Sequence, residues 1–134
     1  CLLSRGLGDV YKRQGILCSL SFGVNAKVWK CSFNEQARLH PIEGIVVSNN
    51  LNFELMFEIN NNKVNVIGNN GSEPVKSNWG DNAVTFVEEL STGINQTTTV
   101  IFKSGSAVHS RHTLMGGTTF LPSQYYGKCV NMSY

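Results

Sequence analysis

Residues 51–59 have the sequence LNFELMFEI, in which every second side chain is Leu, Phe or Ile. A repeat of two residues places these large apolar side chains on one face of a β-strand and leaves the other face mostly in water. The asparagines at 60–62 tolerate left-handed turn conformations. Because Val64 and Val66 then share one side of a second alternating segment, the sequence predicts a β-hairpin at this point.

Further strand patterns recur at intervals of about ten residues on both sides of this hairpin. Strands are expected at residues 27–33, 44–48, 75–79, 81–90, 96–103, 107–115, 118–121 and 124–132. Pro74 places the strand that follows it at a sheet edge or at its own start. One short helix is expected at residues 34–39, capped by Asn34 and ended before Pro41.

The number and spacing of these strands predict an all-β fold. About eight strands joined by short turns are typical of a single small antiparallel β-barrel, with an architecture like that of lipocalins or streptavidin, or of a two-sheet β-sandwich. We favour an up-and-down barrel whose first and last strands are neighbours, because closure removes sheet edges. The length of 134 residues fits one domain.

Two segments before this domain have a different character. Residues 9–14 resemble the in-frame translation of a transposon-end sequencing adapter, so we interpret residues 1–14 as adapter sequence. Residues 15–26 are apolar and small, and end in the small-x-small pattern of Val24 and Ala26, which is typical of the rear half of a secretory signal peptide. The β-domain is therefore expected to span residues 27–134 and to be periplasmic or secreted.

The expected domain holds two cysteines, Cys31 near its start and Cys129 near its end. An even number of cysteines in a small exported domain is typical of a disulfide. We therefore predict a Cys31–Cys129 bridge that ties the two ends of the domain together. A Cys-x-x-Cys pair is absent, so the sequence does not support a redox-active dithiol or a zinc ribbon.

Charge and motifs narrow the classes of function. The formal charge is +2, and without residues 1–14 the acidic and basic residues balance, so a nucleic-acid partner is not expected. No apolar run is long enough for a transmembrane helix. Phosphate-binding loops, nucleophile elbows and His-Glu-x-x-His helices are all absent. We therefore predict neither a cofactor nor a metal, and the sequence names no catalytic residue.

Residues 108–113 form the most chemically loaded stretch, VHSRHT. On a strand His109 and Arg111 share one face while His112 lies on the other. If that first face points into a barrel, the pair can bind a carboxylate or phosphate through charge-assisted hydrogen bonds. Trp79 is a further candidate ligand-binding residue, although aromatic side chains in a small β-domain more often form the core.

Three hypotheses of function follow from these features. The leading one is a monomeric, exported binding module, of bacterial origin as judged from its asparagine richness, that holds an unknown small ligand or protein. The second is a secreted protein-interaction or inhibitor domain, which a solid interior without a cavity would favour. The third is a small hydrolase, which would need at least two of His109, Arg111 and His112 in one cleft.

Overall fold

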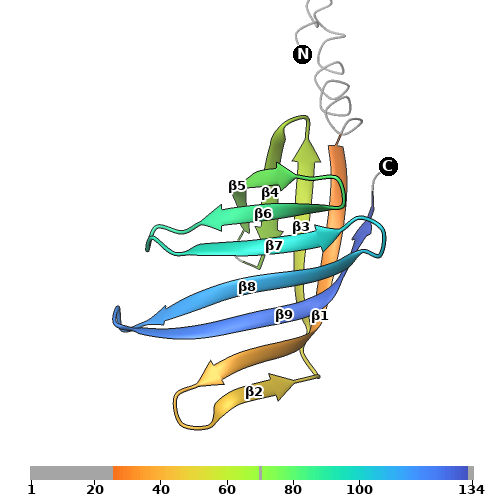
Figure 1. The fold of residues 1–134 in the computed structure, drawn as a ribbon. Helices are drawn as coiled ribbons and strands as arrows, with labels where there is room; N and C mark the ends of the chain where they lie inside the picture. The colour runs from red at the N-terminus through yellow and green to blue at the C-terminus, as the bar shows by residue number, and fades with distance from the viewer. Residues whose placement is uncertain (1–25, 70, 133–134) are drawn as a thin grey trace, which may run out of the picture.

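The computed structural model describes residues 26–69 and 71–132, which form nine antiparallel strands and no helix (Figure 1). No helix long and apolar enough to cross a membrane therefore occurs among these residues. The strands are β1 (Ala26–His40), β2 (Gly44–Ser48), β3 (Phe53–Asn60), β4 (Lys63–Gly68), β5 (Gly71–Trp79), β6 (Ala83–Glu89), β7 (Asn95–Ile101), β8 (Ser106–Met115) and β9 (Thr119–Asn131).

Eight of the strands close into a barrel. Each strand from β3 to β9 pairs with the next along the chain, and β9 pairs with β1, so the first and last strands are neighbours as predicted. The remaining strand, β2, lies outside this closed sheet and pairs only with β1. The all-β class and the barrel are confirmed, and the architecture is not a two-sheet sandwich.

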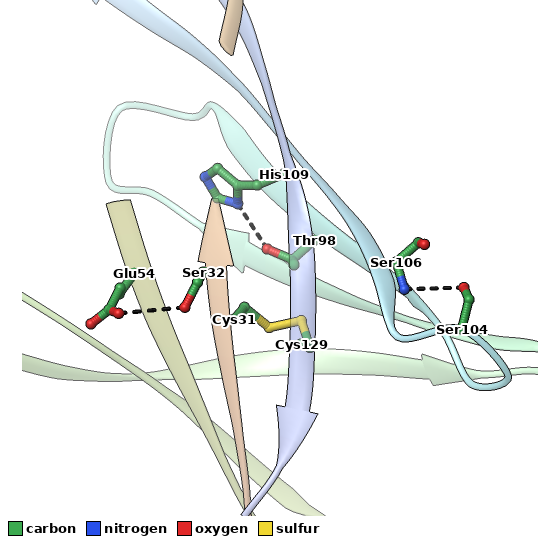
Figure 2. Close-up of a disulfide and its surroundings, with 8 residues drawn as sticks. All are labelled: Cys31, Ser32, Glu54, Thr98, Ser104, Ser106, His109 and Cys129. Atoms are coloured by element: carbon green, nitrogen blue, oxygen red, sulfur yellow. Dashed lines mark hydrogen bonds between the residues drawn. A yellow bond between two sulfur atoms is a disulfide. The ribbon is translucent and has the colours of Figure 1, made fainter. Parts of the chain in front are cut away.

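The predicted disulfide lies on the line where the barrel closes. Cys31 of β1 and Cys129 of β9 are direct partners in the strand register, and their sulfur atoms are bonded (Figure 2). Cys31 is completely buried. The bridge therefore adds a covalent link to the sheet hydrogen bonds that join the two ends of the domain.

The helix predicted at residues 34–39 is wrong, because these residues continue β1. The register of β1 against β9 shifts between Phe33 and Glu35, which is a β-bulge. Before the bulge β1 pairs with β3, and after it the same edge pairs with β2. Two neighbouring strands thus satisfy the backbone on both sides of this segment, and this non-local pairing outweighs its helix propensity.

The close approach of β9 to β1 at the bulge requires a glycine at position 127. Gly127 of β9 is the register partner of Phe33, and a Cβ atom added to it would overlap the backbone of Ser32 and Phe33. Any other residue would push β9 away from β1 at this position. The prediction of two strands at 118–121 and 124–132 is also corrected, since β9 runs through both without a break.

Hairpin geometry follows the sequence elsewhere. Asn61, in the turn between β3 and β4, has a φ of 58° and is the single non-glycine residue of the described chain in the left-handed region. Pro74 lies inside β5, opposite Asn65 of β4, in the part of β5 that precedes its pairing with β6 from Lys76 onward. A residue without an N–H group is tolerated there because no second neighbour requires it.

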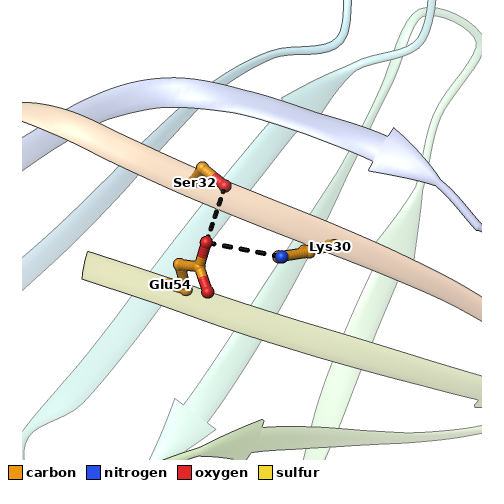
Figure 3. A network of polar contacts seen from close by, with 3 residues as sticks. All are labelled: Lys30, Ser32 and Glu54. Atoms are coloured by element: carbon orange, nitrogen blue, oxygen red, sulfur yellow. Dashed lines mark hydrogen bonds and ion pairs between the residues drawn. The ribbon is translucent and has the colours of Figure 1, made fainter. Parts of the chain in front are cut away.

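Alternating side chains from all eight barrel strands fill the interior. The largest fully buried ones include Phe33, Phe57 and Phe86, and the rings of Phe57 and Phe86 stack with centroids 4.2 Å apart. Outside the barrel, Glu54 of β3 accepts a hydrogen bond from Ser32 and forms an ion pair with Lys30 at 3.5 Å (Figure 3). This contact is exposed to solvent, so the apolar interior dominates the stability of the barrel.

Aromatic rings gather at one end of the barrel. Trp29 has its ring centroid 6.0 Å from Trp79 and 6.2 Å from both Phe86 and Phe102. We refer to these four residues as the aromatic end. The segments expected to be adapter sequence and signal peptide, residues 1–14 and 15–26, lie outside the described residues except for Ala26, where β1 begins.

Candidate functional site

An open cavity of about 1010 Å³ lies at the end of the barrel opposite the aromatic end. Glu73, near the start of β5, lines the cavity, whereas Trp79 ends the same strand at the aromatic end. The cavity walls combine apolar side chains such as Leu55 and Val75 with a few charged ones. We refer to this open end of the barrel as the mouth, which is the usual place for a ligand in a small barrel.

Arg111 of β8 lines this mouth and has aromatic neighbours. Its guanidinium carbon lies 5.0 Å from the ring centroid of Tyr125 and 5.7 Å from that of Phe53, within cation–π range. Within residues 26–69 and 71–132 the ion pairs join other residues, so no carboxylate neutralises Arg111. Its Nε atom is buried and has no hydrogen-bond partner. A positive charge with donors to spare therefore faces the cavity.

His109 lies two residues before Arg111, on the same inward face but deeper in the barrel. It is only 2% exposed, and its Nδ1 atom is 2.7 Å from the hydroxyl of Thr98 (Figure 2). Burial, followed by the nearby charge of Arg111, lowers the pKa of His109 to about 4. The imidazole is therefore neutral at pH 7, and its Nε2 atom has no partner within the described structure.

Three aromatic rings surround His109 and separate it from the mouth. Its ring centroid is 5.5 Å from Phe53, 5.8 Å from Tyr125 and 6.0 Å from Phe33. Of these, Phe53 also lines the cavity. His109 is thus part of the floor beneath the mouth, where it supports the two rings that hold Arg111.

The side chains of residues 108–113 lie on the two faces of β8 as the alternation predicted. His109 and Arg111 share the inward face of β8, whereas His112 is exposed on the outside, with its ring centroid 6.3 Å from Phe120. Arg111 is the one residue of these three that lines the mouth.

Trp79 is not brought together with His109 and Arg111. It belongs to the aromatic end, where its ring stacks on Phe102 at 6.0 Å and about half of its surface is exposed. Its position at the close of β5 makes it a cover for the barrel interior rather than a wall of the mouth. The interpretation of Trp79 as a core or rim residue fits this placement better than a role beside Arg111.

Three carboxylates that line the cavity, those of Glu73, Glu88 and Glu89, were not among the site residues predicted from the sequence. Glu73 of β5 and Glu88 of β6 both line the mouth, and burial together with the repulsion from Glu73 raises the pKa of Glu88. Alternation could have revealed Glu88, since it follows the buried Val84 and Phe86 at intervals of two residues. Its neighbour Glu89 is more exposed and forms an ion pair at 3.2 Å with Lys76, which also lines the cavity.

Gln36 was also missed, because it lies in the segment expected to be helical. Its side-chain amide donates a hydrogen bond of 3.0 Å to the hydroxyl of Tyr125. This contact ties the ring beneath Arg111 to β1 and so fixes one wall of the mouth. In the part of the chain that the structure describes, no three His, Cys, Asp or Glu side chains converge on a metal-binding position.

The mouth therefore combines an apolar wall, the unpaired guanidinium of Arg111, the carboxylates of Glu73 and Glu88 on neighbouring strands, and the ion pair between Lys76 and Glu89. Such a surface suits an amphipathic small molecule whose polar group reaches Arg111. Comparisons with other proteins add no further constraint. No family model matches the sequence, and neither a curated protein nor a solved structure is significantly similar to it.

Proposed function

We propose that this protein is a non-enzymatic binding module that holds a small molecule with an apolar body and a single anionic group in the mouth of its barrel. The observation that carries the proposal is the unpaired guanidinium of Arg111, held over the rings of Phe53 and Tyr125 at an open cavity. Arg111 is half-buried, and its buried Nε atom has no hydrogen-bond partner. A carboxylate would offer acceptors to the guanidinium in bidentate geometry.

The other charged residues of the mouth support a carboxylate rather than a phosphate-rich ligand. Glu73, Glu88 and Glu89 line the same cavity as Arg111, and the charge of Lys76 is already paired with Glu89. The repulsion between Glu73 and Glu88 already disfavours further negative charge at this position. A ligand with several negative charges would add to that repulsion, whereas a monocarboxylate places one charge beside Arg111. The apolar part of the ligand would contact side chains such as Leu55 and Val75.

We also propose that the protein works outside the cytoplasm. The disulfide between Cys31 and Cys129 supports this, because structural disulfides persist in oxidising compartments. The signal-peptide pattern at residues 15–26 points to the same location. Binding in an oxidising compartment fits a carrier or scavenger of a small molecule released or taken up by the cell.

Isothermal titration calorimetry with three eight-carbon probes tests the ligand class. Octanoate, octanol and octylamine share their apolar chain and differ in their head group, so their affinities isolate the contribution of charge. We expect octanoate to bind most tightly and Arg111→Gln to weaken it by about tenfold or more, since a hydrogen bond to a charged group contributes about 1.5–3 kcal/mol.

Arg38→Gln provides the matched control, because Arg38 is an exposed arginine of β1 that does not line the mouth. It should leave the affinity for octanoate unchanged, and circular dichroism should show that both variants retain the strand content of the wild type. Equal affinities of the three probes, or equal effects of the two arginine substitutions, would contradict the proposal.

A further inference from the structure

The closed barrel leaves one strand edge open, and it belongs to β2. This strand pairs through one edge with Gln36–His40 of β1. No backbone hydrogen bond joins its other edge to any residue of the described chain. Figure 1 shows β2 beside the extended end of β1, outside the ring of barrel strands. The N–H and C=O groups of that edge are therefore available to another strand.

None of the usual protective features is present on this edge. The strand Gly44–Ser48 has no charged residue and no proline, and its pairing with β1 contains no bulge. Its apolar side chains are open to solvent, with Ile45 76% and Val47 66% exposed. Natural proteins normally block a free edge of this kind with lysine, proline or a bulge, because it would otherwise recruit another chain.

Exposed apolar surface continues from β2 onto β1. Leu39 is the register partner of Ile45, and Ala37 is the partner of Val47, so these four side chains share one face of the two-stranded sheet. Leu39 is 48% exposed. An apolar face bordered by an open edge is the surface that strand addition extends, because a new strand continues both the hydrogen bonds and the face.

We propose that β2 pairs antiparallel with β2 of a second copy of this chain, about a two-fold axis at Val46. In that register Val46 faces its own counterpart, Ile45 faces Val47 of the other copy, and Gly44 faces Ser48. The strand is self-complementary in this arrangement, because apolar residues meet apolar residues on one face. The contact is the same patch on both copies, as a two-fold dimer requires.

The residues on either side of β2 introduce no charge repulsion in this pairing. Beyond the strand, Glu43 would lie opposite Asn49 of the other copy, so no like charges face each other. Gly44–Ser48 has no charged residue and no deep pocket that could select a partner of different sequence. The structure thus favours a homodimer over the monomer expected from the sequence. This inference is independent of the ligand proposed for the mouth.

Sedimentation velocity on the wild type and two lysine variants tests the contact. Val47→Lys places a charge on the open-edged strand β2, whereas Val130→Lys places one on β9, where Val130 pairs with Lys30 of β1 and does not contact β2. The two valines are similarly exposed, at 66% and 62%. We expect a dimer for the wild type and Val130→Lys and a monomer for Val47→Lys, with thermal unfolding showing that both variants are folded.

Cysteine cross-linking tests the register. Directly opposed residues of antiparallel strands have Cα atoms about 4.5–5.5 Å apart, which a disulfide can bridge. Val46→Cys should therefore give a covalent dimer on mild oxidation. Ser48→Cys should not, because its counterpart lies four positions along the strand, about 13 Å away. A monomeric wild type, a dimeric Val47→Lys, or cross-linking of Ser48→Cys but not Val46→Cys would overturn the proposal.

Discussion

Cys31 of β1 and Cys129 of β9 face each other across the seam of the barrel, with their Cα atoms 3.8 Å apart and their sulfurs joined in a disulfide. They are 98 residues apart in the sequence. The bridge therefore closes a loop that includes nearly all of the described chain, and it does so at the pair of strands on which closure of the barrel depends.

Loss of this bridge should strongly destabilise the protein. Because a closed loop of this length restricts the unfolded chain, Cys129→Ser is expected to lower the free energy of unfolding by about 4 kcal/mol. Urea denaturation monitored by tryptophan fluorescence measures the change, and wild-type protein treated with a reducing agent is the matched control. An unchanged denaturation midpoint in both samples would contradict a stabilising disulfide.

The burial of His109 predicts a loss of stability in acid. Since the pKa of His109 falls from 6.5 to about 4 on folding, the unfolded chain binds a proton between these pH values and the folded chain does not. The free energy of unfolding should therefore fall as the pH decreases from 6.5 to 4, by up to about 3 kcal/mol from this residue.

Two glutamine variants isolate this effect. His109→Gln should remove the pH-dependent loss, whereas His112→Gln, which changes an exposed histidine on the outer face, should retain it. Urea denaturation at several pH values between 4 and 7 provides the comparison. A His109→Gln profile parallel to that of the wild type would show that His109 does not cause the acid sensitivity.

The raised pKa of Glu88 predicts the opposite dependence. A carboxyl whose pKa is higher in the folded state favours folding at low pH, and that contribution is lost as the pH rises through its folded pKa. Glu88→Gln removes the charge, so its melting temperature relative to the wild type should increase between pH 4 and pH 7. Glu89→Gln, which alters the exposed partner of Lys76, should show no such increase.

Glu88→Gln should also strengthen the binding of octanoate. The substitution removes a negative charge from the mouth while leaving Arg111 in place, so the affinity should rise by a factor of about two to five at low salt. The gain should shrink as salt is added. An affinity that falls, or a gain independent of salt, would indicate that the carboxylate probe does not approach this wall.

Trp79 should matter for stability and not for the ligand. Trp79→Ala removes ring contacts with Trp29, Phe86 and Phe102, and we expect it to cost about 1–3 kcal/mol in the free energy of unfolding. The dissociation constant of octanoate should stay within about twofold of the wild-type value, because Trp79 lies at the aromatic end. A large loss of octanoate affinity would place a ligand at the aromatic end instead.

Local alternation accounts for the parts of the fold that the sequence predicted. The strand expected at residues 51–59 appears as Phe53–Asn60, because the alternating face has to reach the interior whatever its neighbours are. The segment at 34–39 failed for the opposite reason. Its local propensity favours a helix, and its pairing with β9 on one side and β2 on the other makes it a strand, as at Gln36, which faces both Tyr125 and Ser48.

The residues of the candidate site also fall into those that local alternation predicts and those that depend on strand register. Alternation alone put His109 and Arg111 on one face of β8. The separation of Trp79 from Arg111 could have been predicted, because each hairpin reverses the chain direction. The end of β5, where Trp79 lies, is therefore at the same end of the barrel as the start of β8, whereas Arg111 lies further along β8. Phe53 and Glu73 could not be assigned to the mouth without the register, because their contact with Arg111 or its cavity depends on barrel closure.

A crystal structure of the protein with octanoate tests the central claim most directly. We expect the carboxylate to lie within hydrogen-bond distance of the Arg111 guanidinium, about 2.7–3.0 Å, with the alkyl chain against Leu55 and Val75. Octanoate bound at the aromatic end, bound on the outer surface, or absent from the mouth at saturating concentration would contradict it.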